Sequence, residues 1–143
     1  MSPDEARALF ATARVARLAT VGPDARPHLV PIVFALAGDV VYSAVDAKPK
    51  RTTALKRLAN VARNPRVALL ADHYDDADWG ALWWVRADGV ARVVEGADAE
   101  RGIALLRERY EQYRADPPRG PVLAIAVERW SGWRASVSAS RRP

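Results

Sequence analysis

The sequence contains no cysteine and only two histidines, His28 and His73, among its 143 residues. Without cysteine the chain has no disulfide framework, no thiolate zinc site and no thiol nucleophile. The two histidines lie on different predicted strands without metal-ligand spacing, so we expect both to be neutral and hydrogen-bonded, with no metal bound. No nucleophile–base pair stands out either, and the sequence therefore assigns no catalytic residue.

Long hydrophobic runs are also missing, because every apolar stretch is of strand length and is interrupted by arginine, aspartate or glycine. We therefore expect no membrane-spanning helix. Asp4 and Glu5 occupy the place where a signal peptide would carry basic residues. Half of the residues are hydrophobic, which excludes a disordered chain, and the length suits a single domain over residues 1–143. Together these features favour a cytoplasmic protein with no membrane partner.

The chain carries a formal net charge of +5, which suits either a nucleic acid or an anionic small molecule as the partner. A single-stranded nucleic-acid site needs aromatic side chains among its cations, and the basic stretch 48–66 contains none. We therefore expect no nucleic-acid partner. The acidic cluster of Asp75, Asp76 and Asp78 lacks the glycine and glutamate spacing of a calcium loop, so we predict a solvated loop there.

Alternating apolar and polar residues predict short strands linked mainly by hairpins. Pro31 lies inside the second strand and indicates an edge or a bulge, because proline cannot donate to a sheet ladder. A bend is predicted near Asp88 and Gly89. The predicted elements are a helix over 3–13, strands over 15–21, 27–36 and 40–45, a helix over 51–62, strands over 66–73 and 82–95, a helix over 99–113 capped by Asp98, and a strand over 122–130.

These strands do not alternate regularly with helices, which argues against a parallel sheet. We predict a small β-barrel, mostly antiparallel and closed or partly closed, with peripheral α-helices. Because side chains fill the interior of such a barrel, a flat cofactor would bind outside it. A second subunit would then be the obvious cover.

The stretch from Val40 to Asp72 is the most informative part of the sequence. Its first predicted strand leads into a loop with Lys48, Lys50 and Arg51, and a helix begins at that loop. Free backbone N–H groups and the positive end of the helix dipole add to these side-chain charges, an arrangement that binds phosphate. We therefore predict an anionic cofactor as the ligand.

A simpler alternative applies to the basic residues further along this helix, since charged residues on a short helix usually face solvent. Lys56 and Arg57 suit cofactor binding and plain solvation equally well. Four apolar residues mark the predicted buried side of the helix: Leu55, Leu58, Ala59 and Ala62.

Six segments follow one another in a distinctive order and spacing. They are 17–21 (RLATV), 27–34 (PHLVPIVF), 48–58 (KPKRTTALKRL), 64–69 (NPRVAL), 82–92 (LWWVRADGVAR) and 128–133 (ERWSGW). Together they resemble the split β-barrel flavin/deazaflavin oxidoreductases, a superfamily often labelled pyridoxamine 5′-phosphate oxidase-like. The KPKR loop and the LWWVR strand most resemble the actinobacterial branch assigned to the deazaflavin coenzyme F420.

This resemblance implies an FMN-binding-like split barrel and a homodimer with two cofactor sites at its interface. The implied phosphate contacts are Lys48, Lys50 and Arg51, with Lys56 and Arg57 as outer candidates. The implied ring contacts are Val30, Pro31, Ile32, Val33, Ser43, Ala44 and Val45, with Trp83, Trp84 or Trp130 as a wall from the facing subunit. For Trp83 and Trp84 the alternative is one core residue and one interface residue, because neighbours on a strand face opposite sides.

The activity implied by the resemblance is coenzyme F420-dependent hydride transfer to a small conjugated acceptor. The alternatives are an FMN-dependent reductase, a pyridoxamine 5′-phosphate oxidase-like enzyme, and a non-catalytic carrier of F420, flavin or haem with the same fold. A haem ligand would have to be His28 or His73, and neither has a supporting motif. Such a cofactor carries the hydride chemistry itself, which suits a chain without a nucleophile–base pair.

Overall fold

The computed structural model describes residues 1–45 and 51–136, without the side chains of residues 51–55. The helices are α1 (Pro3–Thr12), α2 (Arg51–Arg63), α3 (Gly96–Arg109) and α4 (Glu111–Ala115). The strands are β1 (Ala16–Val21), β2 (Pro27–Ile32), β3 (Ala35–Ala37), β4 (Val40–Ala44), β5 (Arg66–His73), β6 (Trp83–Val94) and β7 (Val122–Arg134). Within the described ranges, no helix has the length and apolar character needed to cross a membrane.

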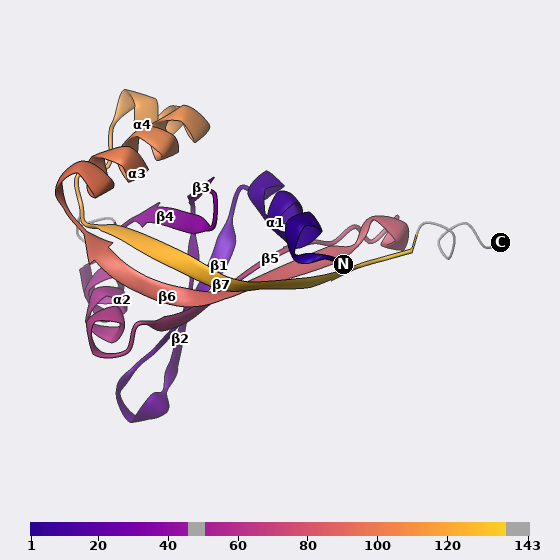
Figure 1. The fold of residues 1–143 in the computed structure, drawn as a ribbon, viewed down its shortest axis with the longest axis horizontal. Coiled ribbons are helices and arrows are strands. Elements are labelled where there is room, and N and C mark those ends of the chain that lie inside the picture. Colours follow the sequence, from indigo (N-terminus) through magenta and orange to yellow (C-terminus); the bar gives the residue numbers. More distant parts are fainter. Residues whose placement is uncertain (46–50, 137–143) are drawn as a thin grey trace.

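The strands form one antiparallel sheet in the order β2-β1-β5-β6-β7-β4-β3, which curls around the core (Figure 1). No backbone ladder joins the edge strands β2 and β3 in the described part of the chain. The hydroxyl of Ser43 on β4 donates to the carbonyl of Val33, just after β2, at 2.9 Å. The predicted split β-barrel is therefore confirmed, and the sheet is not closed.

Two local predictions about the sheet are also confirmed. Pro31 lies on β2, which is an edge strand that pairs only with β1. The predicted bend in β6 is a register shift between Asp88 and Gly89. A Cβ atom at Gly89 would lie 2.3 Å from the carbonyl oxygen of Ala126, so glycine permits the close approach of β7 at this bulge.

Helix α1 covers the inner side of β6 and β7 and supplies Phe10 to the core. Its start is fixed by a capping box in which Ser2 and Glu5 satisfy each other's backbone N–H groups. The Phe10 ring packs against Phe34 at 4.7 Å and against Trp130 at 5.3 Å between ring centroids. This aromatic cluster joins the N-terminal helix to β7 and to the segment between β2 and β3.

Asp39, in the turn between β3 and β4, holds α1 and β7 together. It accepts hydrogen bonds from the Trp130 indole at 2.9 Å and from Arg7 at 3.1 Å. The Trp130 bond, and to a lesser extent the Arg7 bond, holds the pKa of this carboxyl group below its ordinary value of 3.8. The ionised carboxylate therefore stabilises the fold above the ordinary pKa, and this stabilisation is lost as the pH falls through the lowered one.

We expect Asp39→Asn to lower the melting temperature at neutral pH. The difference from the wild-type protein should narrow as the pH falls below the ordinary value of 3.8 and through the lowered pKa of this carboxyl group. Thermal unfolding across a pH series checks this expectation. A difference that stays constant down to the acid limit would contradict a role for the charge.

The hairpin turn between β1 and β2 contains two residues in the left-handed region, Asp24 and Ala25, each with φ of 59°. Such consecutive positive angles match the twist of a tight hairpin but cost an L-residue about 1–2 kcal/mol. Glycine carries no such cost. We expect Ala25→Gly to raise the free energy of unfolding by roughly 0.5–1 kcal/mol.

The matched control is Ala59→Gly, the same substitution on the exposed side of α2. There glycine should lower the free energy of unfolding by about 1 kcal/mol. Urea denaturation measures both changes. A loss of stability in both variants would show that the turn does not adopt this conformation in solution.

The predicted strand 27–36 is wrong in one respect, since it divides into β2 and β3. Extended pairing ends at Ile32, and the chain turns so that the ring of Phe34 is fully buried in the core. The predicted final strand 122–130 is too short, because β7 continues to Arg134. Its last residues still pair with β6, where Arg134 stands opposite Trp83.

The predicted helix 99–113 is also wrong in its limits. It begins at Gly96 and ends at Arg109, because Tyr110 takes an extended conformation in which its hydroxyl bonds the backbone N–H of Phe34 at 3.1 Å. Asp98 is not its cap. This residue lies in the first turn of α3 and accepts hydrogen bonds from Tyr42 at 2.9 Å and Arg92 at 3.0 Å, and these bonds, with that from Tyr42 the stronger influence, lower its pKa.

Candidate functional site

A buried polar seam lies between α2 and the β1–β2 hairpin. Its centre is a 3.0 Å hydrogen bond from the amide of Asn60 on α2 to the hydroxyl of Thr20 on β1, and both residues are buried. The predicted burial of Ala59 and Ala62 is wrong, because both are exposed. Asn60 and the adjacent Val61 are buried in their place, since Thr20 satisfies the polar group of Asn60.

His28 and Arg57 border this seam. His28 stands opposite Thr20 in the β1–β2 ladder, so the two side chains share the face of the sheet that α2 covers. Arg57 precedes Asn60 by three positions and therefore lies on the same side of α2. We define the polar seam as these four residues: Thr20, His28, Arg57 and Asn60.

Two nitrogen atoms of the polar seam lack partners. Nδ1 of His28 and Nε of Arg57 are buried and make no hydrogen bond within the described part of the chain. Burial lowers the pKa of the Arg57 guanidinium, which reflects the cost of removing its charge from water. Buried donors and charges without partners are expensive. The seam is thus suited to an anionic ligand that would complete these bonds.

The basic loop predicted to bind phosphate runs from the end of β4 to the start of α2. Lys48 and Lys50 lie outside the described residues, and Arg51 begins α2 with a side chain that is likewise not described. The strand predicted before these residues and the helix predicted after them are present as β4 and α2. Of the two outer candidates, Lys56 is exposed, whereas Arg57 is half-buried.

The residues expected to contact a cofactor ring lie on both faces of their strands. Val30, Ile32 and Val45 belong to the main hydrophobic core, so only their backbone groups remain for a ligand. Pro31 is exposed, and Val33 and Ala44 are partly buried. Ser43 is buried but lies within hydrogen-bond distance of the Val33 carbonyl, so the structure does bring these two strands together.

The tryptophans separate into core and surface residues. Trp130 packs in the aromatic cluster beside Phe10, so it is a core residue and no pocket wall. Trp83 is partly buried against the core, and Trp84 points outward opposite Trp133. The alternative in which Trp83 and Trp84 face opposite sides therefore describes these two residues well.

One part of the outer side of the sheet carries no helix among the described residues, whereas α3 packs on that side further along, against Tyr42, Val122 and Ala124. We call the part without a helix the outer face, and it is formed by outward side chains of β2, β1, β5, β6 and β7: Leu29, Pro31, Arg17, Ala19, Ala68, Leu70, Asp72, Trp84, Arg86, Asp88, Arg129, Ser131 and Trp133. A shallow groove of about 560 Å³ runs over it. Two ion pairs cross it, Arg17 with Asp72 at 3.6 Å and Arg86 with Asp88 at 3.1 Å. The face is therefore apolar between paired charges, as an interface would be.

Sequence reasoning missed His28 as a member of the site, because a lone histidine on a strand is usually a satisfied structural residue. The signal that could have found it is its register. In the hairpin, His28 falls opposite Thr20, a polar residue at a position that the strand pattern places inside. Within the described residues, no group of three histidine, aspartate or glutamate side chains could hold a metal ion.

Solved structures with the same fold include three informative neighbours. A conserved hypothetical protein from Mycobacterium tuberculosis is 27% identical with a TM-score of 0.74, over 94% of this chain and 85% of that chain. A FAD-binding protein from Mesorhizobium loti is 21% identical with a TM-score of 0.72, over 95% and 96% of the two chains. A haem-binding protein from Mycobacterium smegmatis is 19% identical with a TM-score of 0.71, over 92% of this chain and 57% of that one.

A comparison with curated proteins gave no match. The sequence profile of the pyridoxamine 5′-phosphate oxidase family, in contrast, matches residues 2–134. That range contains all of the strands, the polar seam and the basic loop. The chain therefore belongs to the pyridoxamine 5′-phosphate oxidase family of split-barrel proteins.

Proposed function

We propose that this protein binds a phosphorylated flavin-type cofactor beside the polar seam and uses it for hydride transfer to a small conjugated acceptor. The observation that carries the proposal is the pair of buried nitrogens on His28 and Arg57 that have no hydrogen-bond partner among the described residues. They border the helix that follows the basic loop. A phosphate group would supply the acceptor oxygens that both nitrogens lack.

The residues present fit such a cofactor in chemistry as well as in charge. Arg57 offers a planar guanidinium that can hold phosphate oxygens in a forked geometry. His28 can add a second donor when Nδ1 is protonated. Lys50 and Arg51 would add charge from the loop. The backbone of β2 and the segment around Val33 would then face the ring, as the family resemblance implies.

The bound cofactor would supply the hydride chemistry, and the protein would bind it, orient it and exclude water. No side chain of the polar seam needs to act as a nucleophile. The proposed site accordingly consists of strand backbone and the packed helix α2, which would hold the cofactor in position. This division of work is consistent with an oxidoreductase whose reactivity lies in the cofactor.

The choice between coenzyme F420 and FMN follows from charge. F420 carries a lactyl-oligoglutamate tail beyond its phosphate, and Arg63 and Arg66 are exposed cations downstream of Arg57. Several cations that converge on a polyanion can decide between ligands, although salt screens each of them. We expect F420 to bind more tightly than FMN, with an advantage that shrinks as the salt concentration rises.

Equilibrium titration of the purified protein with F420, FMN and FAD at low and high salt tests this expectation. A salt-sensitive preference for F420 supports deazaflavin. Equal or tighter FMN or FAD binding at every salt concentration would instead favour a flavin, as in the FAD-binding neighbour from Mesorhizobium loti. If the protein binds none of the three cofactors, the cofactor proposal itself is contradicted.

A homodimer is part of the same proposal. The outer face is bare and apolar, with Leu29 67% exposed and Trp84 and Leu70 close to 40%. Its two ion pairs are internal, so a second copy could cover Arg17, Asp72, Arg86 and Asp88 while each of these charges keeps its partner. Such a partner would also cover a cofactor that lies over the edge strand β2.

A further inference from the structure

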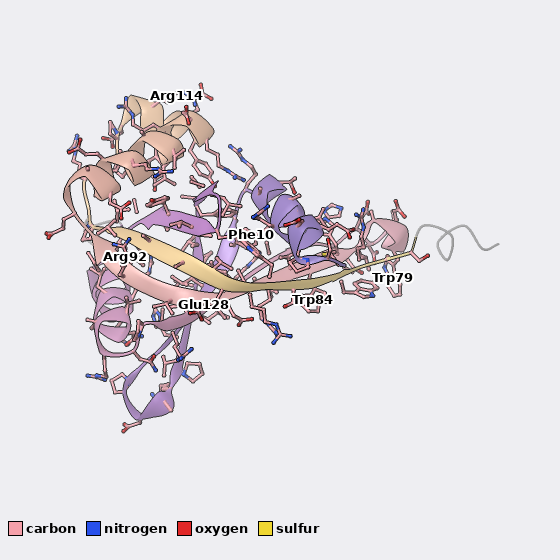
Figure 2. All side chains as sticks on the ribbon, in the orientation of Figure 1. Phe10, Trp79, Trp84, Arg92, Arg114 and Glu128 are labelled. Atoms are coloured by element: carbon pink, nitrogen blue, oxygen red, sulfur yellow. The ribbon has the colours of Figure 1, made fainter. Side chains whose placement is uncertain are left out.

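The loop between β5 and β6 has a rigid, exposed aromatic tip. Trp79 is 65% exposed and Tyr74 is 62% exposed. Figure 2 shows Trp79 at the far end of the arm that β5, β6 and β7 form. Large aromatic side chains held in water at an ordered position are typical anchors for a protein partner.

Hydrogen bonds inside the loop hold this tip in place. Asp78 caps a short 3₁₀ turn through the N–H of Gly80 at 3.0 Å, and Asp75 accepts from the N–H of Ala77 at 2.9 Å. Asp76 accepts from the hydroxyl of Tyr74 at 2.8 Å. None of the three aspartates forms an ion pair with another described residue. The tip is therefore acidic, aromatic and ordered before any partner binds.

The opposite end of the same arm is basic. Arg66 begins β5 on the outer face, and Arg63 ends α2 just before it. Both are exposed, and neither guanidinium has an ion-pair partner in the part of the chain that the structure describes. The eight residues of β5 separate this basic end from the acidic tip, a span of roughly 23 Å at the usual strand rise.

The two ends cannot meet within one molecule, because a straight strand lies between them (Figure 1). A two-fold axis through the middle of the outer face would exchange them, so that each acidic tip meets the basic end of the other copy. Between the ends, four charges of the outer face are already paired, as Arg17 with Asp72 and Arg86 with Asp88, and Arg129 adds one further positive charge beside Asp88. The acidic tip and the basic end therefore carry charges of opposite sign that the exchange would bring together.

We infer that the partner of the β5–β6 loop is a second copy of this chain, with Asp76 facing Arg66 and Trp79 buried at the end of the contact. The inference rests on the dimer of the proposed function and adds its geometry. It assigns each tip to the other protomer's basic end. It also places Arg66 in the contact, where it competes with any acidic cofactor tail.

A charge-swap cycle on the cofactor-free protein tests the contact. Asp76→Lys and Arg66→Glu should each weaken dimerisation roughly three- to tenfold in sedimentation equilibrium, and the double variant should return to within about twofold of the wild-type protein. Matched controls are Glu100→Lys and Arg101→Glu, which make the same charge changes on exposed positions of α3. These controls should leave the dimer constant unchanged.

Trp79→Ala should weaken the dimer roughly thirtyfold, as expected for a large aromatic anchor that the contact buries. Far-UV circular dichroism confirms that each variant folds. The inference is overturned if the wild-type protein is a monomer or if the charge swaps change the dimer constant no more than their controls do. It is also overturned if the free-energy loss of the double variant equals the sum of the losses of the two single variants. Because no cofactor is present, flavin affinity measured separately reports on the proposed function alone.

Discussion

Replacing Arg57 with alanine is expected to lower FMN affinity ten- to a hundredfold, in keeping with the roughly 1.5–3 kcal/mol of a hydrogen bond to a charged group. The guanidinium is half-buried and its Nε has no partner among the described residues. Its charge is therefore held in a costly environment that a phosphate would relieve. Fluorescence titration with FMN measures the change.

Two controls make this result specific. Lys56→Ala removes the same charge from the exposed neighbouring position and should change FMN affinity by less than about threefold. Arg57→Lys keeps the charge but loses the planar, forked guanidinium, so its FMN affinity should lie between those of Arg57→Ala and the wild-type protein. Unfolding of the cofactor-free protein separates the remaining possibilities. If Arg57 is structural, alanine lowers stability and spares affinity, whereas a binding residue gives the reverse pattern.

The largest loss of stability is expected from Phe10→Ala. The side chain of Phe10 is fully buried, and it contacts the rings of Phe34 and Trp130. Removing a ring from a packed core costs the transfer free energy of the lost atoms and leaves a cavity, about 3–5 kcal/mol in total. We expect a fall of that size in the free energy of unfolding, measured with urea.

Phe10→Leu retains much of the buried volume and should lose less than half as much stability. The slope of the urea transition should stay constant if both variants unfold in one step. A loss below about 1 kcal/mol for Phe10→Ala would mean that α1 contributes little to the core. The hydrogen bond from Arg7 to Asp39 would then also contribute little to stability, because it attaches this same helix to the sheet.

Features that depend on local sequence were predicted well. The strand 66–73 has the predicted limits, Pro31 lies on an edge, and the bend in β6 lies at Asp88 and Gly89. Each of these follows from strand periodicity, a missing N–H group or a missing Cβ atom. The strand β4 and the helix α2 likewise follow local patterns.

Features that depend on distant partners could not be predicted. Asn60 is buried because Thr20, forty positions away, accepts its hydrogen bond. Asp98 serves no cap because Tyr42, fifty-six positions away, and Arg92 engage its carboxylate. Tyr110 ends α3 because its hydroxyl reaches Phe34. The periodicity of apolar residues does not encode such pairings. For the same reason, the place of His28 in the polar seam could not be predicted from the sequence.

The strand order has a consequence for how the molecule assembles. Hairpins β1–β2, β3–β4 and β5–β6 join neighbours in the chain, whereas the β1–β5 and β4–β7 ladders each close a long loop. Closing such loops costs chain entropy before contacts repay it, so these ladders should form late and set a slow folding rate. The polar seam needs β1 in place beside α2, and it therefore exists only in nearly native molecules. A cofactor that binds there would select the finished fold and stabilise it by mass action.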